Sequence, residues 1–259
     1  MKFYRKTGVL TGYGDPSEWE NEMKKNLTDA DKEAWATAVK DLEAACAKAG
    51  IDIELSKVLH ASEAIYVDAP IPASGTGRAV QKFTEIWDKG KAAVIWSETT
   101  VTTPDGAPLW RQKRSIFARG EGGFGGDRGP STTAAEPDRA PDLTIDLPTL
   151  PQQALLYRLC GDRNPLHSDP AFAAAAGFPR PILHGLCTYG IGCKAIVDNV
   201  LDGDSTRVRS YGARFAGVVF PGETLQANLW RDGDKITGVL TVPSRDNSVV
   251  LSGVELTAS

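Results

Sequence analysis

With 259 residues, the chain has room for one large domain or two small ones. Hydrophobic residues make up 41% and charged residues 24%, a composition that can form a core and excludes an intrinsically disordered chain. The formal net charge of -4 gives no general electrostatic attraction for nucleic acid or an anionic membrane. We therefore expect a soluble globular protein with neither nucleic acid nor membrane among its partners.

The sequence has no signal-peptide pattern over Met1–Tyr13, no apolar run of about 18 residues, and no peroxisomal tripeptide at its end. These absences predict a cytoplasmic location. The cysteines show no Cys-x-x-Cys spacing and lie among apolar neighbours, which predicts buried, reduced thiols instead of disulfides or a zinc site. They are Cys46, Cys160, Cys187 and Cys193.

Apolar side chains at intervals of three and four residues predict one amphipathic helix from Thr28 to Gly50. They belong to Trp35, Val39, Leu42 and Cys46. Thr28 and Asp31 resemble a capping box, and Gly50 suits the end of the helix. β-Rich stretches follow, separated by turn sequences, and predict a four-stranded antiparallel meander. They cover residues 59–68, 76–87, 91–103 and 107–118.

Residues 120–142 are rich in Gly, Pro, Ser and Asp and contain almost no large apolar side chains, which predicts a linker. Beyond it we expect a strand near 143–147, then helices, then a second four-stranded meander. The helices are predicted at 151–160, 171–176 and 185–200, and the strands at 207–220, 223–231, 235–242 and 248–257.

Three pairs of turns indicate a duplicated fold. Pro70 and Pro221, Gly90 and Gly233, and Asp105 and Asp246 are offset by 151, 143 and 141 residues. A helix followed by an antiparallel sheet, twice, predicts an α+β protein, and the hot-dog fold is the known architecture in which a curved sheet holds one long helix. We expect a double hot-dog with halves over residues 1–119 and 143–259, joined by the 120–142 linker.

Two patterns suggest cofactors that their context does not support. Gly120–Gly125 satisfies the G-x-G-x-x-G pattern, but the residues that follow do not open a helix, so a linker or ligand lid is favoured over a nicotinamide site. The histidines His60, His167 and His184 lack the spacing of a metal site. His60 is expected to be a satisfied histidine at a strand start, and we predict no metal and no cofactor.

The segment from Tyr157 to His167 contains the most informative residues. It places Asp162, Asn164 and His167 within six residues. Gly161 permits a tight turn and Pro165 keeps the preceding residue out of helical geometry, so the acidic and imidazole side chains can point at one place without sharing a helix. Further on, Gly185 begins a long apolar helix, where its N–H is a free donor at the positive helix end.

A carboxylate, an imidazole, an amide and a backbone donor, with no nucleophilic Ser or Cys, meet the requirements for adding water across a double bond next to a thioester. The alternative is that Asp162 and His167 only cap helices and satisfy loop amides. Spacing alone leaves both interpretations open.

Residues Tyr157–Thr188 closely resemble the signature of the hydratase 2 family, the (R)-specific 2-enoyl-CoA hydratases related to MaoC and to the hydratase part of peroxisomal multifunctional enzyme type 2. Weaker similarities extend over residues 51–257. They include Lys57–His60, Asp88–Gly90, Arg119–Gly126, Ala213–Phe215 and Pro221–Gly222.

The resemblance implies reversible hydration of trans-2-enoyl-CoA to (3R)-hydroxyacyl-CoA without a metal or redox cofactor. By this resemblance Asp162 and His167 match the catalytic pair, Asn164 matches a third polar residue, and Gly185 matches the oxyanion donor. The N-terminal half of such proteins lacks the motif and helps to house the acyl group. Since residues 1–50 depart from the family pattern, a fatty acyl group and a bulky or ring-bearing one both stay open.

Six further residues are candidates for substrate binding. Arg119 and Arg214 could meet the CoA phosphates or could be strand-end charges. The others are Gly122, Gly123, Phe124 and His184. Two alternative functions stay open, a hot-dog acyl-CoA thioesterase and a non-catalytic acyl-CoA-binding subunit, and the free edge of a hot-dog sheet predicts a homodimer.

Overall fold

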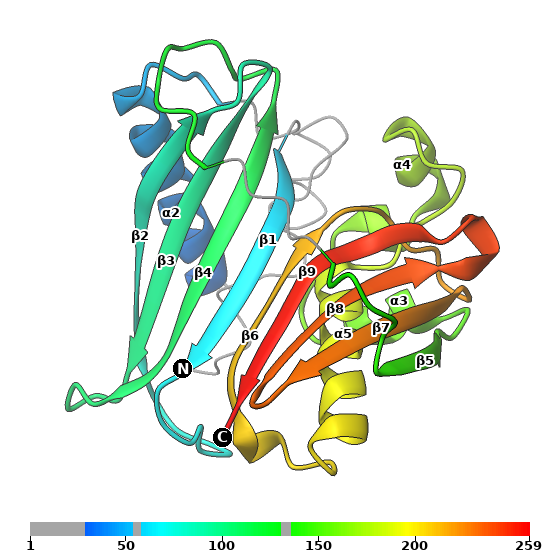
Figure 1. The fold of residues 1–259 in the computed structure, drawn as a ribbon. Helices are drawn as coiled ribbons and strands as arrows, with labels where there is room; N and C mark the ends of the chain where they lie inside the picture. The colour runs from blue at the N-terminus through cyan, green and yellow to red at the C-terminus, as the bar shows by residue number, and fades with distance from the viewer. Residues whose placement is uncertain (1–28, 54–57, 131–135) are drawn as a thin grey trace.

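The computed structural model describes residues 29–53, 58–130 and 136–259. We call the part from α2 to β4 the first half and the part from β5 to β9 the second half (Figure 1). The first half contains α2 (Asp29–Lys48), β1 (Val58–Val67), β2 (Arg78–Asp88), β3 (Ala92–Thr102) and β4 (Pro108–Arg119). All of these elements coincide with predicted segments to within about two residues at each end.

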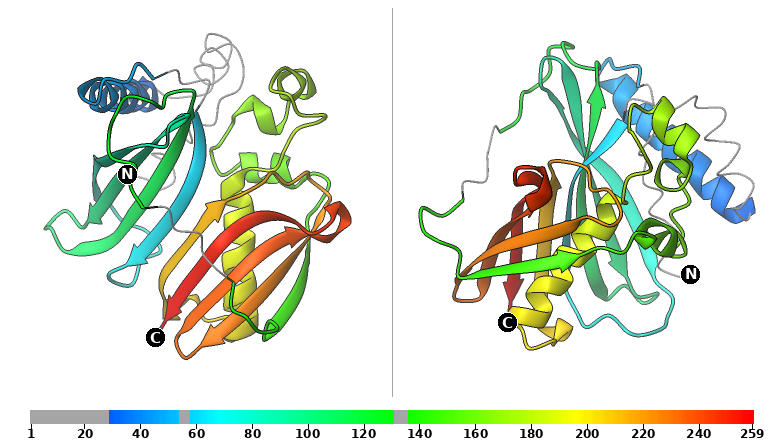
Figure 2. Two further views of the ribbon diagram at one scale, coloured as in Figure 1. Left: turned by 45° about the horizontal axis from the view of Figure 1, so that its top comes forward. Right: turned by 90° about the vertical axis from the view of Figure 1, so that its right-hand side faces the viewer.

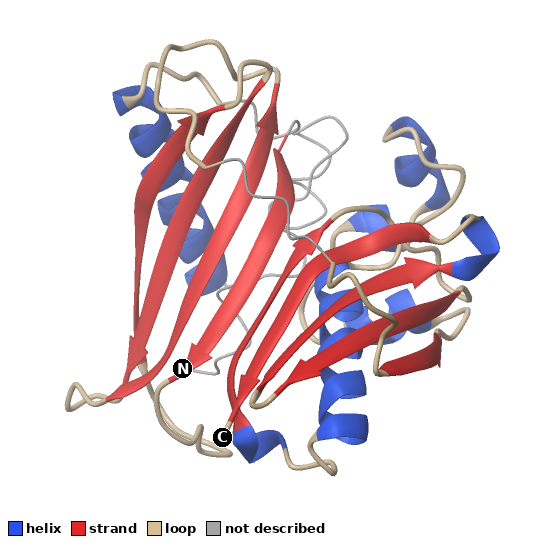
Figure 3. Ribbon diagram, in the orientation of Figure 1, coloured by secondary structure: helices blue, strands red, loops and turns tan. Residues whose placement is uncertain are grey.

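The second half adds a strand and three helices before its main sheet (Figure 3). The elements are β5 (Leu143–Pro148), α3 (Gln153–Arg158), α4 (Pro170–Ala175), α5 (Gly185–Val200), β6 (Val208–Phe215), β7 (Thr224–Asp232), β8 (Lys235–Val242) and β9 (Ser248–Ala258). Short 3₁₀ turns lie at Pro165–His167, Ser205–Arg207 and Pro243–Arg245. This order agrees with the predicted one, although β6 ends at Phe215 instead of continuing to residue 220.

The described strands form one sheet in the order β2-β3-β4-β1-β6-β9-β8-β7-β5. The halves meet where β1 and β6 pair antiparallel, with Ser62 opposite Arg214 and Tyr66 opposite Ser210. On either side of this seam the strand order is the same, with β2-β3-β4-β1 on one side and β7-β8-β9-β6 on the other. The fold is the expected α+β double hot-dog.

The predicted meander is wrong for the first strand of each half. β1 pairs with β4, and β6 pairs with β9, so neither first strand lies beside the strand that follows it. The connection over residues 68–77 contains two prolines and is too long for a tight hairpin turn, and it carries the chain across the end of the sheet to β2. As a result, the outer edge of β1 is available to β6.

One helix covers one face of each half (Figure 2). In the first half, Leu42 and Cys46 of α2 pack in a buried cluster with Ile95 and Ile116 of the sheet. The predicted end of this helix is confirmed, since α2 ends at Lys48 and Gly50 takes a positive φ of 77°. The predicted cap at Thr28 and the side chain of Trp35 lie outside the described residues.

In the second half, α5 packs on the sheet through a buried apolar cluster that includes Ile196 of α5, Leu240 of β8 and Leu256 of β9. Two tyrosines add a reciprocal link between helix and sheet. The Tyr189 hydroxyl donates to the Tyr211 carbonyl at 2.7 Å, and the Tyr211 hydroxyl donates to the Tyr189 carbonyl at 3.0 Å. Helix α5 is therefore anchored at a fixed position on the sheet.

The glycine-rich loop after β4 folds around one carboxylate. Asp88 accepts hydrogen bonds from the backbone N–H groups of Gly90 at 2.7 Å and of Gly123 and Gly125 at 2.8 Å. A side chain at Gly122 would place its Cβ 2.4 Å from the Ala92 nitrogen, so the backbones approach here because glycine permits it. The described parts of residues 120–142 contain no helix or strand, so no helix begins within the Gly120–Gly125 pattern.

The cysteines follow their prediction with one exception. All four are free thiols, Cys46 and Cys187 are buried, and Cys193 is partly buried. Cys160 is exposed, contrary to expectation, because α3 ends at Arg158 and the following turn faces solvent. Among the described helices, none combines the length and the apolar character needed to cross a membrane.

Candidate active site

The loop between α3 and α4 is shaped by short-range hydrogen bonds. Gly161 takes a positive φ of 117°, which turns the chain at the end of α3. Asp162 Oδ1 then accepts from the Asn164 N–H at 3.2 Å, and Asn164 Oδ1 caps the next 3₁₀ turn by accepting from the Leu166 N–H at 3.0 Å. His167 ends this turn, so the bend brings the acid and the imidazole to the same side of the loop.

A small apolar cluster supports the loop from below. Asp169 caps α4 by accepting from the N–H groups of Ala171 and Phe172, and Ala173 of α4 packs in a buried cluster with Leu166 and Ile182. The loop is therefore held in place by packing and not only by its own hydrogen bonds.

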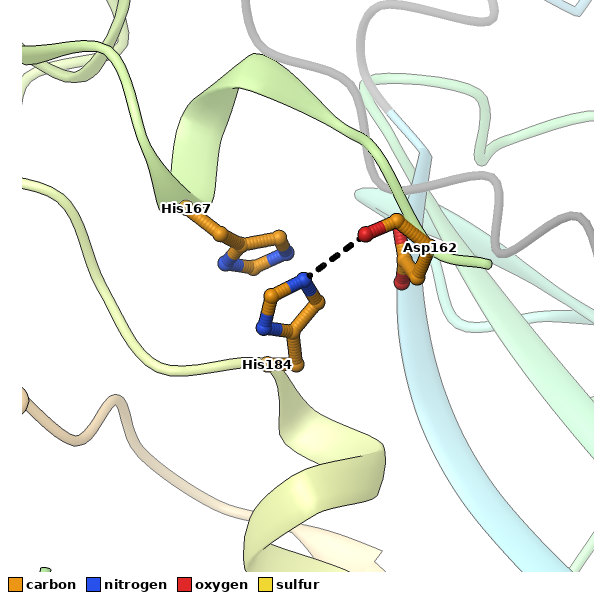
Figure 4. A group of neighbouring side chains, drawn as sticks. All are labelled: Asp162, His167 and His184. Carbon is orange, nitrogen blue, oxygen red and sulfur yellow. Dashed lines mark hydrogen bonds between the residues drawn. The ribbon is translucent and has the colours of Figure 1, made fainter. Parts of the chain in front are cut away.

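Asp162, His167 and His184 converge at the N-terminus of α5 (Figure 4). One carboxylate oxygen of Asp162 and one ring nitrogen of each histidine all lie within 4.8 Å of one another. The rings of His167 and His184 stack with centroids 3.7 Å apart and planes 29° apart. His167 and His184 are 5% and 1% exposed, whereas Asp162 as a whole residue is partly exposed.

Backbone carbonyls determine which nitrogen of each imidazole is protonated. His167 Nδ1 lies 2.8 Å from the Ile182 oxygen and donates to it, which leaves a lone pair on Nε2. His184 Nε2 lies 3.2 Å from the Asp162 carbonyl oxygen and donates to it. His184 Nδ1 is buried and has no hydrogen-bond partner within the described residues.

Burial sets the charge states of the three groups. It lowers the pKa of His167, and it lowers the pKa of His184 to about 3, with the neighbouring His167 acting in the same direction. It also raises the pKa of Asp162, against the opposing effect of His167. At neutral pH both imidazoles are uncharged, and His167 Nε2 can accept a proton.

The start of α5 supplies a hydrogen-bond donor. His184 is the N-cap residue but makes no capping bond through its side chain, and Gly185 is exposed. The N–H groups of the first helical turn carry the positive end of the helix dipole. A Cβ at Gly185 would lie 3.2 Å from two ring atoms of Phe215, so glycine permits this close approach of the helix terminus to the ring.

Asp162, His167 and His184 could each offer one ligand atom to a metal ion, although the spacing of the histidines in the sequence did not indicate such a group. Two neutral imidazoles can stack in this way without charge repulsion, and the His184 ring packs against the His167 ring.

The remaining candidate substrate residues lie elsewhere on the described chain. Arg119 is exposed at the end of β4, and Arg214 lies in β6 at the seam. The backbone N–H of Gly123 is bound by Asp88, and Phe124 packs against the α2 cluster. Gly122 packs against the β2–β3 turn. Of the six residues, only His184 joins the group of Asp162 and His167, and the roles of all six stay predictions.

Three features of the site were not singled out from the sequence. The Tyr157 ring lies 4.8 Å from His184, and the Ile182 carbonyl fixes the proton on His167. The contact of a backbone carbonyl cannot be predicted from residue types, because every residue has one. Buried Glu63 of β1 was also missed, although a charged residue on the same strand face as Ile65 is a detectable irregularity.

Comparison with known proteins connects this geometry to a family. The MaoC like domain matches residues 132–249, and the MFE-2 hydratase 2 N-terminal domain matches residues 34–120. Enoyl-CoA hydratase ChsH3 of Mycobacterium tuberculosis is 73% identical over 207 residues, which span 80% of this chain and 72% of that protein.

Solved structures agree with this assignment. The crystal structure of a MaoC-like dehydratase from Phytophthora capsici superposes with a TM-score of 0.73 at 33% identity, over 78% of this chain and 69% of that one. A Mycobacterium tuberculosis protein described as a double hot-dog fold shares the architecture, with a TM-score of 0.53 at 13% identity over 79% of this chain and 76% of the other. The chain therefore belongs to the MaoC-like hydratase family, in the group that combines a MaoC-like half with a hydratase 2 N-terminal half.

Proposed function

We propose that this protein is an (R)-specific enoyl-CoA hydratase, which adds water reversibly to trans-2-enoyl-CoA to give (3R)-3-hydroxyacyl-CoA. The observation that carries the proposal is the convergence of Asp162, neutral His167 and the donor end of α5. The enoyl-CoA hydratase name of the 73% identical relative supports the same reaction.

Each group has a role in the proposed reaction. His167 Nε2 and the Asp162 carboxylate hold one water between them, and the pair removes a proton from it. The water oxygen bonds to C3 as the double-bond electrons move toward the thioester oxygen, where the Gly185 N–H stabilises the developing negative charge. The proton held by the pair then goes to C2, so that one water is added in total.

Asn164 has a supporting role in this mechanism. It is 1% exposed, and its side-chain oxygen is occupied by the Leu166 N–H, so it shapes the loop on which Asp162 and His167 stand.

The proposal extends to the acyl group, the assembly and the location. We propose an acyl group of fatty or ring-bearing type that lies against the first half, and a cytoplasmic homodimer. Because β1 and β6 already pair with each other, a second copy would use another surface, such as the sheet edges at β2 and β5. Light scattering and cell fractionation test the last two points.

The decisive experiment follows crotonyl-CoA by loss of the conjugated thioester absorbance, with an (R)-specific and an (S)-specific 3-hydroxyacyl-CoA dehydrogenase as stereochemical readouts. We expect turnover and an (R) product. A thiol reagent in parallel detects a thioesterase, which would release free CoA, and acyl-CoA binding without turnover would indicate a binding subunit. A panel of enoyl-CoAs of increasing length and bulk then defines the acyl group.

A further inference from the structure

A second buried polar cluster lies on the first half. Glu63 of β1 accepts from Gln112 and from Arg114, whose Nε lies 3.0 Å from Glu63 Oε2. His60 Nε2 lies 3.0 Å from the same oxygen. The side chains of His60, Glu63 and Arg114 are only 7%, 5% and 16% exposed, and the mechanism proposed above uses none of them.

The cluster holds His60 in one orientation and one tautomer. Its Nε2 faces two acceptors, Glu63 Oε2 and the Ser62 carbonyl oxygen at 3.0 Å, so this nitrogen carries the hydrogen. Burial lowers the pKa of His60, which is therefore neutral at pH 7. Burial alone would raise the pKa of Glu63, but Arg114 and the hydrogen bonds from His60 and Gln112 bring it below its ordinary value. Glu63 is thus a charged anchor for a neutral ring.

An aromatic contact connects His60 to the second half. Its ring centroid lies 4.6 Å from that of Phe215, the last residue of β6. The Phe215 ring also lies close to the start of α5, where a Cβ at Gly185 would be 3.2 Å from the ring. Phe215 also lies 6.4 Å from Tyr189 of α5. A continuous row of contacts therefore runs from Glu63 through His60 and Phe215 to the helix terminus.

We propose that His60, oriented by Glu63, is a positioning residue for hydration, because it holds Phe215 against the α5 terminus and so sets the position of the Gly185 N–H. This inference rests on the proposed function. Through these contacts the half that lacks the catalytic loop contributes to the rate. An oxyanion donor acts over a narrow range of distance, about 2.7–3.1 Å, and misplacement by about 1 Å can cost 10²-fold in rate.

The test is a double-mutant cycle on kcat for crotonyl-CoA with His60→Leu and Phe215→Leu, which replace each ring by an aliphatic side chain. We expect each single variant to lower kcat about tenfold with KM within twofold, and the double variant to be no slower than the worse single variant. The reason is that both changes break the same row of contacts. His60→Gln keeps a donor for Glu63 but lacks the ring, and should behave like His60→Leu.

The matched control is Ser62→Ala on the same strand. It removes the buried hydrogen bond between the hydroxyls of Ser62 and Ser115, 2.5 Å apart, and leaves the side chains of the row intact. We expect a lower melting temperature and an unchanged kcat. A merely structural His60 would show the same pattern as Ser62→Ala, and that result would overturn the proposal.

The remaining outcomes are also decisive. If the fold-decreases in kcat of the two single variants multiply in the double variant, His60 does not act through Phe215. If His60→Leu does not fold, Phe215→Leu and His60→Gln still complete the test, and normal kcat in both would reject the inference. Failure of the wild-type protein to hydrate any enoyl-CoA would reject the proposed function itself, which distinguishes the two failures.

Discussion

The two halves share a strand order but place their polar residues differently. In the second half, a loop between β5 and α5 brings Asp162 and His167 to the start of the helix. In the first half, the polar residues lie on the sheet, where Glu63 joins His60 and Arg114, and at the strand turn held by Asp88. One copy of the fold thus keeps reactive groups on a preformed loop, while the other uses its carboxylates to fix structure.

Two aspartates show how the carboxylate that we propose to be reactive, that of Asp162, differs from a structural one, that of Asp88. Asp88 accepts hydrogen bonds from the backbone N–H groups of Gly90, Gly123 and Gly125, and those with Gly123 and Gly90 are the largest influences that lower its pKa. Asp162 accepts one, from Asn164, and burial raises its pKa. A carboxylate that lacks hydrogen bonds is costly to ionise and, for that reason, is a better proton acceptor.

The largest expected effect comes from removing the Asp162 carboxylate, which tests the contrast between Asp162 and Asp88 directly. Asp162→Asn should lower kcat by about 10²–10⁴-fold, because the proton acceptor is lost. It should also raise the melting temperature at pH 7. Since folding raises the pKa of Asp162, its ionised form opposes folding at any pH above the unfolded value, and Asn removes that cost. Steady-state kinetics and thermal unfolding measure the two effects.

Asp88→Asn is the matched variant in the first half and should show the opposite pattern, with near-normal kcat and a lower melting temperature. The pKa of Asp88 is lowered in the folded protein, so its stabilisation is present above the unfolded value and is lost as pH falls through the folded value. A fall in activity for both variants, or for neither, would contradict the division of roles between the halves.

The pH dependence of the rate tests the charge states proposed for Asp162 and His167. The proposed mechanism requires ionised Asp162 and neutral His167. Burial raises the pKa of the first and lowers that of the second. We expect kcat/KM to be constant around neutral pH and to fall about tenfold per pH unit on the acid side, with a midpoint above that of an ordinary carboxyl. Because the groups are coupled, the midpoint belongs to the pair. An alkaline limb near pH 7, as for a required imidazolium, would contradict the neutral-imidazole assignment.

Much of this arrangement was predictable from local patterns. The strands from β1 to β4 follow from β-rich stretches between turn sequences, and the bend at Asp162 follows from Gly161 and Pro165. Strand neighbours were not predictable, because the pairing of β1 with β4 and β6 depends on how a long connection crosses the sheet. The same limit applies to Phe215, whose place between His60 and Gly185 is created by contacts across the seam.

A smaller effect is expected at the helix terminus. Gly185→Ala places a Cβ 3.2 Å from the Phe215 ring, so the ring or the helix must shift by a few tenths of an ångström. We expect kcat to fall about tenfold with little change in KM, since the donor acts mainly on the transition state. Kinetics on crotonyl-CoA measure this, and a rise in KM with unchanged kcat would mean that Gly185 serves ground-state binding.

The smallest effect concerns the helices of the two halves. Helix α2 contains no glycine, whereas α5 contains Gly185, Gly190 and Gly192. A Cβ at Gly192 would lie 2.8 Å from the Tyr211 hydroxyl oxygen, but one at Gly190 would meet nothing within 4 Å. Gly190→Ala should therefore raise the free energy of unfolding by about 0.5–1 kcal/mol through helix propensity and leave kcat unchanged.

Gly192→Ala is the matched variant and should lower the free energy of unfolding, because the new methyl group displaces the Tyr211 hydroxyl from its bond to the Tyr189 carbonyl. Denaturant unfolding of both variants measures the difference. Equal stabilisation by the two substitutions would show that close packing of α5 on β6 does not require glycine at this position. Opposite signs would show that the tyrosine pair, which has no counterpart among the described contacts of α2, fixes the helix on which the reactive loop is assembled.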